Sequence, residues 1–235
     1  MAEKVLERAE FLGRVSLLSK LSTPELTLLA NGIVERRFAP CQTVFAEGQP
    51  CSSLFIIRDG TVKVAKYGST GRALILRLEG SGALLGEIAA FDGQPYPATA
   101  ESVDEAFLYE IPRPTILSFT RHHPDFAIYL CQIFASRLRS AYSVLQDFSM
   151  APVDQRVATV LLKLCDGLAE STHQQMTLLC IRVTRQDLAE MSGCTKESVC
   201  RVTARFKREG LLKLSSGRIH IARNRLRAWL DGQIE

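Results

Sequence analysis

The sequence predicts an α+β protein with an N-terminal β-roll, one long helix and a C-terminal winged helix-turn-helix. Short runs of β-branched and aromatic residues alternate with Gly and Pro turns, which is typical of a roll or barrel. A long amphipathic helical pattern follows, and two short helical patterns then meet at a glycine, as in a helix-turn-helix. We expect the domains to comprise residues 1–122, 123–150 and 151–235.

The first 32 residues are predicted to be helical. Ser22 to Glu25 is a helix start signal, because a capping hydroxyl precedes a proline in the first turn. Leu54–Arg58 and Thr61–Val64 flank Asp59-Gly60, which favours a type I′ turn, so these strands are expected to pair as a hairpin. Further strands that would complete a jelly-roll, cupin-like β-roll are Thr43–Phe45, Ala73–Leu78, Ala98–Ser102 and Ala106–Ile111.

A long helix is predicted from Asp125 to Met150. Its apolar residues recur at intervals of three and four, which places them on one face. Such a face can pack on the body of its own subunit, but its length favours the seam of a parallel dimer. The residues of this stripe are Leu130, Phe134, Leu138, Ala141, Leu145 and Phe148.

Pro152 disfavours helical conformation in the residue before it, so we expect a domain boundary and a hinge there. A new helix should run from Asp154 to Leu164. A polar loop at 171–175 and a strand at 178–183 should lead into the helix-turn-helix.

The two helices of the helix-turn-helix carry clear start and stop signals. Thr184 and Thr195 are suited to cap them, Gly193 permits the turn between them, and Gly210 marks the end of the second helix. The segment after Gly210 contains two short strands around Ser215 to Gly217, which predicts a hairpin wing.

The second helix is predicted to have an inner and an outer face. Val199, Val202 and Phe206 would face the core, while Glu197 and Arg201 lie one turn apart on the other side. Arg can form two hydrogen bonds with guanine and Glu can accept one from cytosine, whereas the simpler interpretation is a surface ion pair. The candidate DNA-binding residues are Thr184, Arg185, Thr195, Lys196, Glu197, Ser198, Arg201 and Arg205.

The distribution of charge agrees with this interpretation. Residues 151–235 contain 14 basic and 9 acidic side chains, whereas residues 1–150 carry a net charge of −1. A basic excess next to the helix-turn-helix suits binding to DNA phosphates. Arg223, Arg225 and Arg227 near the C-terminus could contact phosphates or form a solvated basic face.

Residues 183–189 (Val-Thr-Arg-Gln-Asp-Leu-Ala) and 193–201 (Gly-Cys-Thr-Lys-Glu-Ser-Val-Cys-Arg) resemble the DNA-binding motif of the Crp/Fnr family of bacterial transcription regulators. In that family, the positions of Lys196, Glu197 and Arg201 contact the operator half-site. The resemblance implies an effector-responsive homodimer that binds a palindromic operator and acts by contacting RNA polymerase or by blocking it.

Gly48, Asp59-Gly60 and Gly86-Glu87 resemble the glycine framework of the family's cyclic-nucleotide-binding sensor domain. The ligand positions depart from that pattern. Tyr96 and Pro97 stand where nucleotide binders have an Arg and a small hydroxyl residue, and neither can clamp a cyclic phosphate. We therefore expect the roll to respond to an effector other than cyclic AMP, or to none. The candidate pocket residues are Glu87, Tyr96, Ala141 and Tyr142.

The effector is not revealed by the cysteines or histidines. The seven cysteines form no Cys-x-x-Cys pair, and the first forty residues lack the cysteine cluster of iron–sulfur sensors in the resembled family. We expect mostly buried, reduced thiols, with a thiol switch at Cys41 or Cys51 as an alternative. Haem, which related sensors use to bind gases, is a possible cofactor, although no histidine is assigned as its ligand and no metal site is predicted. The histidines are His122, His123, His173 and His220.

Other functional classes are less well supported. A cyclic-nucleotide-binding regulatory module would lack the helix-turn-helix and would carry Arg at position 96. An enzyme is not expected, because no nucleophile–base–orienter set is recognisable. The sequence has no signal-peptide core and no apolar run long enough to span a membrane, so a cytoplasmic location is expected.

Overall fold

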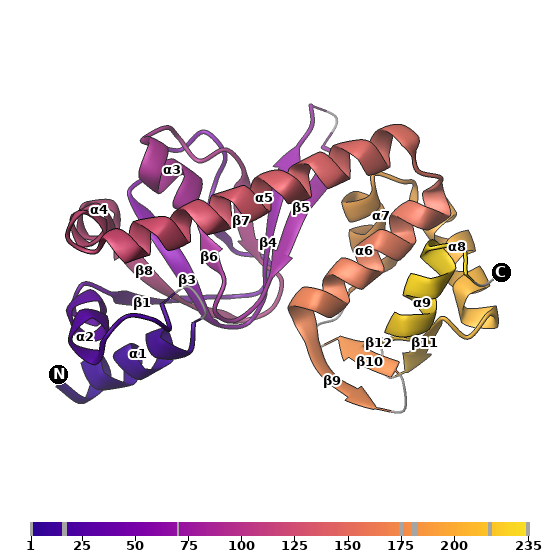
Figure 1. Cartoon of the computed structure of the whole chain (residues 1–235). Coiled ribbons are helices and arrows are strands. Elements are labelled where there is room, and N and C mark those ends of the chain that lie inside the picture. Colours follow the sequence, from indigo (N-terminus) through magenta and orange to yellow (C-terminus); the bar gives the residue numbers. More distant parts are fainter. Residues whose placement is uncertain are drawn as a thin grey trace. The chain divides into compact units, whose positions relative to one another are not determined.

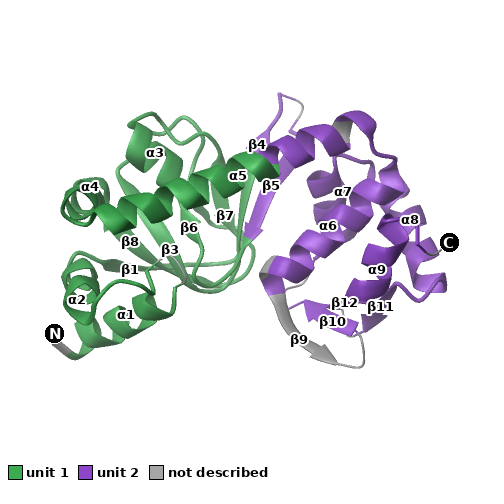
Figure 2. Ribbon diagram, viewed as in Figure 1, with its two compact units in different colours: residues 1–65, 79–140 green, residues 66–78, 141–235 purple. Residues whose placement is uncertain are grey.

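The computed structural model describes residues 2–15, 18–69, 71–173, 176–179, 183–215 and 218–233. The chain forms two compact units (Figure 2). Unit 1 contains residues 1–65 and 79–140, and unit 2 contains residues 66–78 and 141–235. One unit limit lies within the long helix, and the domain limits expected at 122 and 150 stay a prediction.

Two helices open the chain, as expected: α1 (Ala2–Arg14) and α2 (Thr23–Asn31) (Figure 1). The start signal of α2 is confirmed. Ser22 and Glu25 form a reciprocal capping box, in which the Ser22 backbone N–H donates to Glu25 Oε2 over 2.6 Å. Two further helices, α3 (Glu87–Asp92) and α4 (Arg113–His122), were not predicted.

The β-roll is built from two four-stranded antiparallel sheets, in the strand orders β1-β8-β3-β6 and β2-β7-β4-β5. The predicted strands are present, and the edge strand β1 and the two-residue β6 join them. The strands are β1 (Val34–Phe38), β2 (Thr43–Phe45), β3 (Ser53–Asp59), β4 (Val62–Tyr67), β5 (Ala73–Glu79), β6 (Leu84–Leu85), β7 (Thr99–Ser102) and β8 (Ala106–Pro112).

The hairpin predicted at Asp59-Gly60 is wrong, because β3 and β4 belong to different sheets. β3 pairs with β8, and β4 pairs with β7. Gly60 has a φ of +86°, and a Cβ there would lie 2.5 Å from the Glu105 carbonyl oxygen. The turn therefore carries the chain from one sheet to the other. The dipeptide indicated a tight turn but did not determine which strands pair.

The long helix α5 (Pro124–Met150) is confirmed, and its apolar stripe has two environments. Leu130 is buried and Phe134 is partly buried within unit 1. Leu138 and Leu145 are 53% and 61% exposed, and Tyr142, which lies next to the stripe, is 62% exposed. The first half of the stripe thus packs on its own chain, whereas the second half is uncovered. The side chain of Phe148 lies outside the described residues.

Unit 2 contains the helix-turn-helix core. Its elements are α6 (Val153–Leu168), β9 (Ala169–His173), β10 (Met176–Leu179), α7 (Arg185–Ser192), α8 (Lys196–Arg208), β11 (Leu212–Ser215), β12 (Arg218–Ile221) and α9 (Arg223–Leu230), and the sheet order is β11-β12-β10-β9. The polar loop expected at 171–175 is wrong for 171–173, which form part of β9 because they pair with β10.

Three expectations in unit 2 fall partly on residues that the structure does not describe. Residues 174–175 of the expected loop, 180–182 of the expected strand and 216–217 of the wing turn lie outside the described residues. Within the expected strand, Leu178 and Leu179 lie in β10, whereas Val183 is described and lies in no strand. Pro152, the expected hinge, lies between α5 and α6. Among the described residues, no helix is long and apolar enough to cross a membrane.

Candidate nucleic-acid interface and ligand pocket

Helix α7 begins at a cap that the sequence predicted. Thr184 Oγ1 accepts a hydrogen bond from the Asp187 backbone N–H over 3.1 Å, and Asp187 Oδ2 accepts from the Thr184 backbone N–H over 2.7 Å. Gly193, with a φ of +61°, closes the helix in the left-handed conformation that glycine adopts easily. The start and end of α7 are therefore fixed by local contacts.

Helix α8 has the expected inner face. Val199 and Phe206 are fully buried and Val202 is 7% exposed, and all three belong to the core of unit 2. Thr195 caps the helix by accepting a hydrogen bond from the Ser198 backbone N–H over 3.3 Å. Burial of these apolar side chains fixes the rotation of α8 about its axis, which determines the residues that face outward.

The outer face presents Glu197 and Arg201 to solvent. Hydrogen bonds from its own backbone N–H and from Thr195, together with the positive charge of Lys196, lower the pKa of Glu197, so its carboxylate is an acceptor. Arg201 makes one long hydrogen bond, 3.5 Å from Nη2 to Ser198 Oγ. The donors of Arg201 and the acceptor of Glu197 therefore lie one turn apart, where both can reach base edges.

The remaining candidate DNA-binding residues divide into two groups. Thr184, Arg185, Thr195 and Lys196 are exposed at the first turns of α7 and α8, and Ser198 is half-buried beside them. Arg205 does not join them. Its guanidinium lies 3.1 Å from Asp154 Oδ2 on α6 and packs 5.1 Å from the centre of the Trp229 ring. Arg205 thus links α8 to α6 and α9, a contact that helix periodicity could not reveal.

The C-terminal arginines are partly engaged within the chain. Arg223 forms an ion pair with Asp166, and Arg225 donates to the Glu209 carbonyl oxygen over 3.1 Å. Arg227 is exposed on α9. Both earlier interpretations of this basic face, phosphate contact or solvation, stay open.

In the roll, Glu87 begins α3 and is 1% exposed. Its carboxylate forms an ion pair with Arg137 of α5, and Arg137 Nη2 also donates to the Leu84 carbonyl oxygen over 2.8 Å. Sequence reasoning missed Arg137, because Arg137 and Arg139 both flank Leu138 of the apolar stripe and nothing local distinguishes them. The buried carboxylate is thus compensated from within the chain.

Tyr96 is 4% exposed and directed into the roll. Its hydroxyl donates to the Ser53 carbonyl oxygen over 2.5 Å, and its ring stacks on Phe45 with 4.0 Å between ring centres. Burial raises the pKa of Tyr96, and a hydrogen bond with the Cys51 thiol adds to the increase. A neutral phenol that is already hydrogen-bonded provides no clamp for a phosphate.

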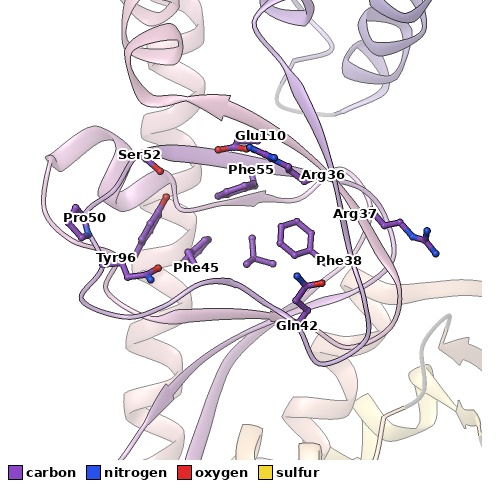
Figure 3. A pocket seen from close by; sticks show the side chains of 12 residues that line it. Arg36, Arg37, Phe38, Gln42, Phe45, Pro50, Ser52, Phe55, Tyr96 and Glu110 are labelled. Atoms are coloured by element: carbon purple, nitrogen blue, oxygen red, sulfur yellow. The ribbon is translucent and has the colours of Figure 1, made fainter.

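The roll contains a pocket of about 620 Å³, lined from β1, β2, β3 and β8 and by Tyr96 (Figure 3). Of the four candidate pocket residues, only Tyr96 lines it. Glu87 is bound to Arg137, while Ala141 and Tyr142 are exposed on α5. The structure therefore does not gather these four side chains around this pocket.

The exposure of the thiols differs from expectation. Among the six described cysteines only Cys165 is buried, and burial raises the pKa of its thiol to about 11. Cys41 and Cys131 are exposed. The expectation of mostly buried thiols is therefore wrong. His123 Nδ1 is 2.7 Å from Glu25 Oε1. No described histidine lines the pocket of the roll, and no cluster of potential metal ligands occurs among the described residues.

Comparison with known families assigns both halves of the chain. Residues 35–123 match the model of the cyclic nucleotide-binding domain, and residues 155–229 match the model of the Crp-like helix-turn-helix domain. A β-roll of this type joined to this helix-turn-helix defines a transcription regulator rather than an enzyme.

Full-length relatives agree. The chain is 27% identical over 220 residues to the CRP-like cAMP-activated global transcriptional regulator of Mycobacterium tuberculosis, covering 91% of this chain and 95% of that protein. It is 26% identical over 214 residues to the fumarate and nitrate reduction regulatory protein of Escherichia coli, covering 90% and 84%. The protein belongs to the Crp/Fnr family of transcription regulators.

Solved structures support the same fold. FixK2 from Bradyrhizobium japonicum matches with a TM-score of 0.74 at 22% identity, covering 83% of this chain and 96% of that one. The catabolite activator protein of Thermus thermophilus matches with a TM-score of 0.53 at 26% identity, covering 93% and 99%. The predicted combination of a β-roll, a long helix and a winged helix-turn-helix is confirmed.

Proposed function

We propose that this protein is a cytoplasmic, homodimeric regulator that binds a palindromic operator and responds to an effector other than cyclic AMP. Glu197 and Arg201, exposed together on the outer face of α8, are the observation that carries the DNA-binding part. In this proposal they read neighbouring base pairs, while Thr184, Arg185, Thr195, Lys196 and Ser198 position the helix on the backbone.

The exposed second half of the α5 stripe supports the homodimer. Three large side chains, Leu138, Tyr142 and Leu145, lie uncovered at helical spacing. A second copy of α5 would bury them, and two reading helices about 34 Å apart would then match one turn of DNA. Contact with RNA polymerase and a hinge at Pro152 complete the proposed mechanism.

The environment of position 96 supports an effector other than cyclic AMP. The relative from Mycobacterium tuberculosis is described as cAMP-activated. In this chain Tyr96 is buried and bonded to Ser53, and Pro97 follows it. A gas bound through haem and a change of redox state stay as alternatives, and the described histidines provide no support for haem.

The test is a binding selection with random DNA, using the wild type and the Arg201→Ala variant. We expect a palindrome from the wild type, and from Arg201→Ala a loss of about 1–3 kcal/mol in binding free energy with relaxed preference at one position of each half-site. The control is Arg208→Ala, which removes an exposed arginine at the other end of α8.

We expect Arg208→Ala to leave the base preference unchanged, because Arg208 lies about two helical turns from Arg201. An unaltered preference in Arg201→Ala would contradict the reading role of Arg201. Failure of the wild type to select any sequence, with or without candidate effectors, would contradict the proposed function as a whole.

A further inference from the structure

The pocket in the β-roll is a second feature of the molecule that the DNA-binding surface does not use. Its volume of about 620 Å³ lies within the range of about 300–1,000 Å³ that is typical of small-molecule sites. The Glu87–Arg137 ion pair is not part of its wall. The pocket thus shares only Tyr96 with the four residues at which the sequence pattern placed an effector.

The floor of the pocket is aromatic. Phe45 and Phe55 are each 6% exposed, and their rings are stacked with 6.0 Å between centres and 26° between planes. The other face of this cluster is closed by Tyr96, whose ring is nearly parallel to that of Phe45. Figure 3 shows Phe38 beside these rings. Because both faces of Phe45 are covered, a flat apolar ring would meet the edges of this cluster and the half-buried Phe38.

Two glutamines at the rim present hydrogen-bond donors. Gln42 Oε1 accepts from the Ala39 backbone N–H over 2.8 Å, and Gln49 Oε1 accepts from the Ala46 backbone N–H over 3.0 Å. Because a backbone N–H can only donate, these contacts identify the side-chain oxygens. Within the described structure, the two amide NH₂ groups have no protein acceptor, so they are available to a ligand.

Arg36 adds a positive charge at the same rim. Its Nε donates to Glu110 Oε2 over 2.6 Å, and Glu110 Oε1 accepts from Ser53 Oγ over 2.8 Å. Both oxygens of Glu110 are therefore occupied. The Nη groups of Arg36 have no acceptor among the described residues, and Figure 3 shows Arg36 and Gln42 on opposite sides of the Phe38 ring.

We propose that this pocket binds a small aromatic carboxylate. The aromatic ring would lie against Phe45 and Phe55, and the carboxylate would accept hydrogen bonds from Arg36, Gln42 and Gln49. A rim with unused donors and an occupied Glu110 carboxylate favours an anion over a cation. This inference goes beyond the proposed function, because occupancy of the pocket does not require DNA.

The first experiment is calorimetric titration of the full chain, without DNA, with 1-naphthoate and with its neutral analogue 1-naphthalenemethanol. We expect one saturable 1-naphthoate site per chain. The alcohol has the same rings but lacks the charge, so we expect it to bind at least about tenfold more weakly. Absence of saturable naphthoate binding, or equal affinity for both compounds, would overturn the proposal.

The second experiment compares Arg36→Met with Arg37→Met. Both arginines lie on β1 and line the pocket, but the Arg37 guanidinium points away from the aromatic rings in Figure 3 and forms an ion pair with Glu105 over 2.5 Å. Arg36→Met should weaken 1-naphthoate binding at least about tenfold and leave the alcohol unchanged, while Arg37→Met should change neither. Equal losses in both variants would show a general charge effect and overturn the proposal.

The third experiment fills the pocket with a Val44→Trp substitution. Val44 is half-buried on β2 and lines the pocket, so the larger ring should abolish binding of both compounds. A thermal melt verifies folding of the variant. If Val44→Trp does not fold, the comparison of Arg36→Met with Arg37→Met is the test of the proposal. Because every measurement is made without DNA, failure here is distinguishable from failure to recognise an operator.

Discussion

At the scale of single residues, the buried carboxylate of Glu87 depends on one partner side chain, Arg137. Glu87 is 1% exposed, and Arg137 supplies the opposite charge from a helix fifty positions along the chain. A carboxylate at that depth is stable only with such a partner, because burial removes its hydration. Sequence spacing gave no indication of the pair.

We predict that Arg137→Met lowers the free energy of unfolding by about 3 kcal/mol, because it leaves Glu87 as an uncompensated buried charge. The double variant Arg137→Met/Glu87→Gln should recover most of the loss, since no charge is then buried. Urea denaturation of both variants provides the measurement. Equal stability of Arg137→Met and wild type would show that the pair is not a structural ion pair.

Cys41 is the one described non-glycine residue with a positive φ, at +61°. Glycine adopts this conformation without the steric cost that an L side chain incurs. We predict that Cys41→Gly raises the free energy of unfolding by about 0.5–1 kcal/mol. The control Cys131→Gly, at an exposed position in α5, should lower it by a few tenths of a kcal/mol, because glycine is a poorer helix former.

Urea denaturation under reducing conditions measures both glycine variants. The opposite signs separate local backbone conformation from the general effect of losing a thiol. A destabilised Cys41→Gly would contradict the assignment of strain to that residue.

At the scale of elements, the α5 stripe shows how one periodic pattern serves two environments. Its beginning is covered by unit 1, and its later part is uncovered. We predict that Leu145→Glu weakens dimerisation at least about tenfold, because it introduces a carboxylate into an apolar seam. Sedimentation equilibrium measures the change.

The matched control introduces the same carboxylate one residue later, as Gln146→Glu, outside the stripe and at an exposed position. It should leave the dimerisation constant unchanged. Equal effects of the two substitutions would indicate charge repulsion rather than a specific seam, and a monomeric wild type would exclude the seam altogether.

At the scale of the whole molecule, a sensor-type roll is joined to a DNA-reading domain, and the signal it receives is the open chemical question. We predict no micromolar binding of cyclic AMP by calorimetry, because Tyr96 and Pro97 cannot clamp its phosphate. A saturable isotherm would contradict this prediction. Cooperative melting of the same preparation is the control for folded protein.

The sequence alone determined the features that depend on neighbouring residues. The caps at Thr184 and Thr195, the turn at Gly193 and the inner face of α8 were all predicted, because each arises within one or two helical turns. Six strands of the roll and the long helix α5 were predicted for the same reason, since side-chain periodicity records which face is buried, whereas β1, β6 and β9 were not predicted.

Only the tertiary structure decided which distant segments meet. In the folded chain, β3 and β4 lie in different sheets, and residues from several strands line the aromatic pocket. Arg205 pairs with Asp154, and Arg137 pairs with Glu87. These contacts join residues far apart along the chain, where local conformational preferences carry no information about partners. Strand pairing and compensation of buried charge are set by the closure of the whole core, so they become visible only when the chain is folded.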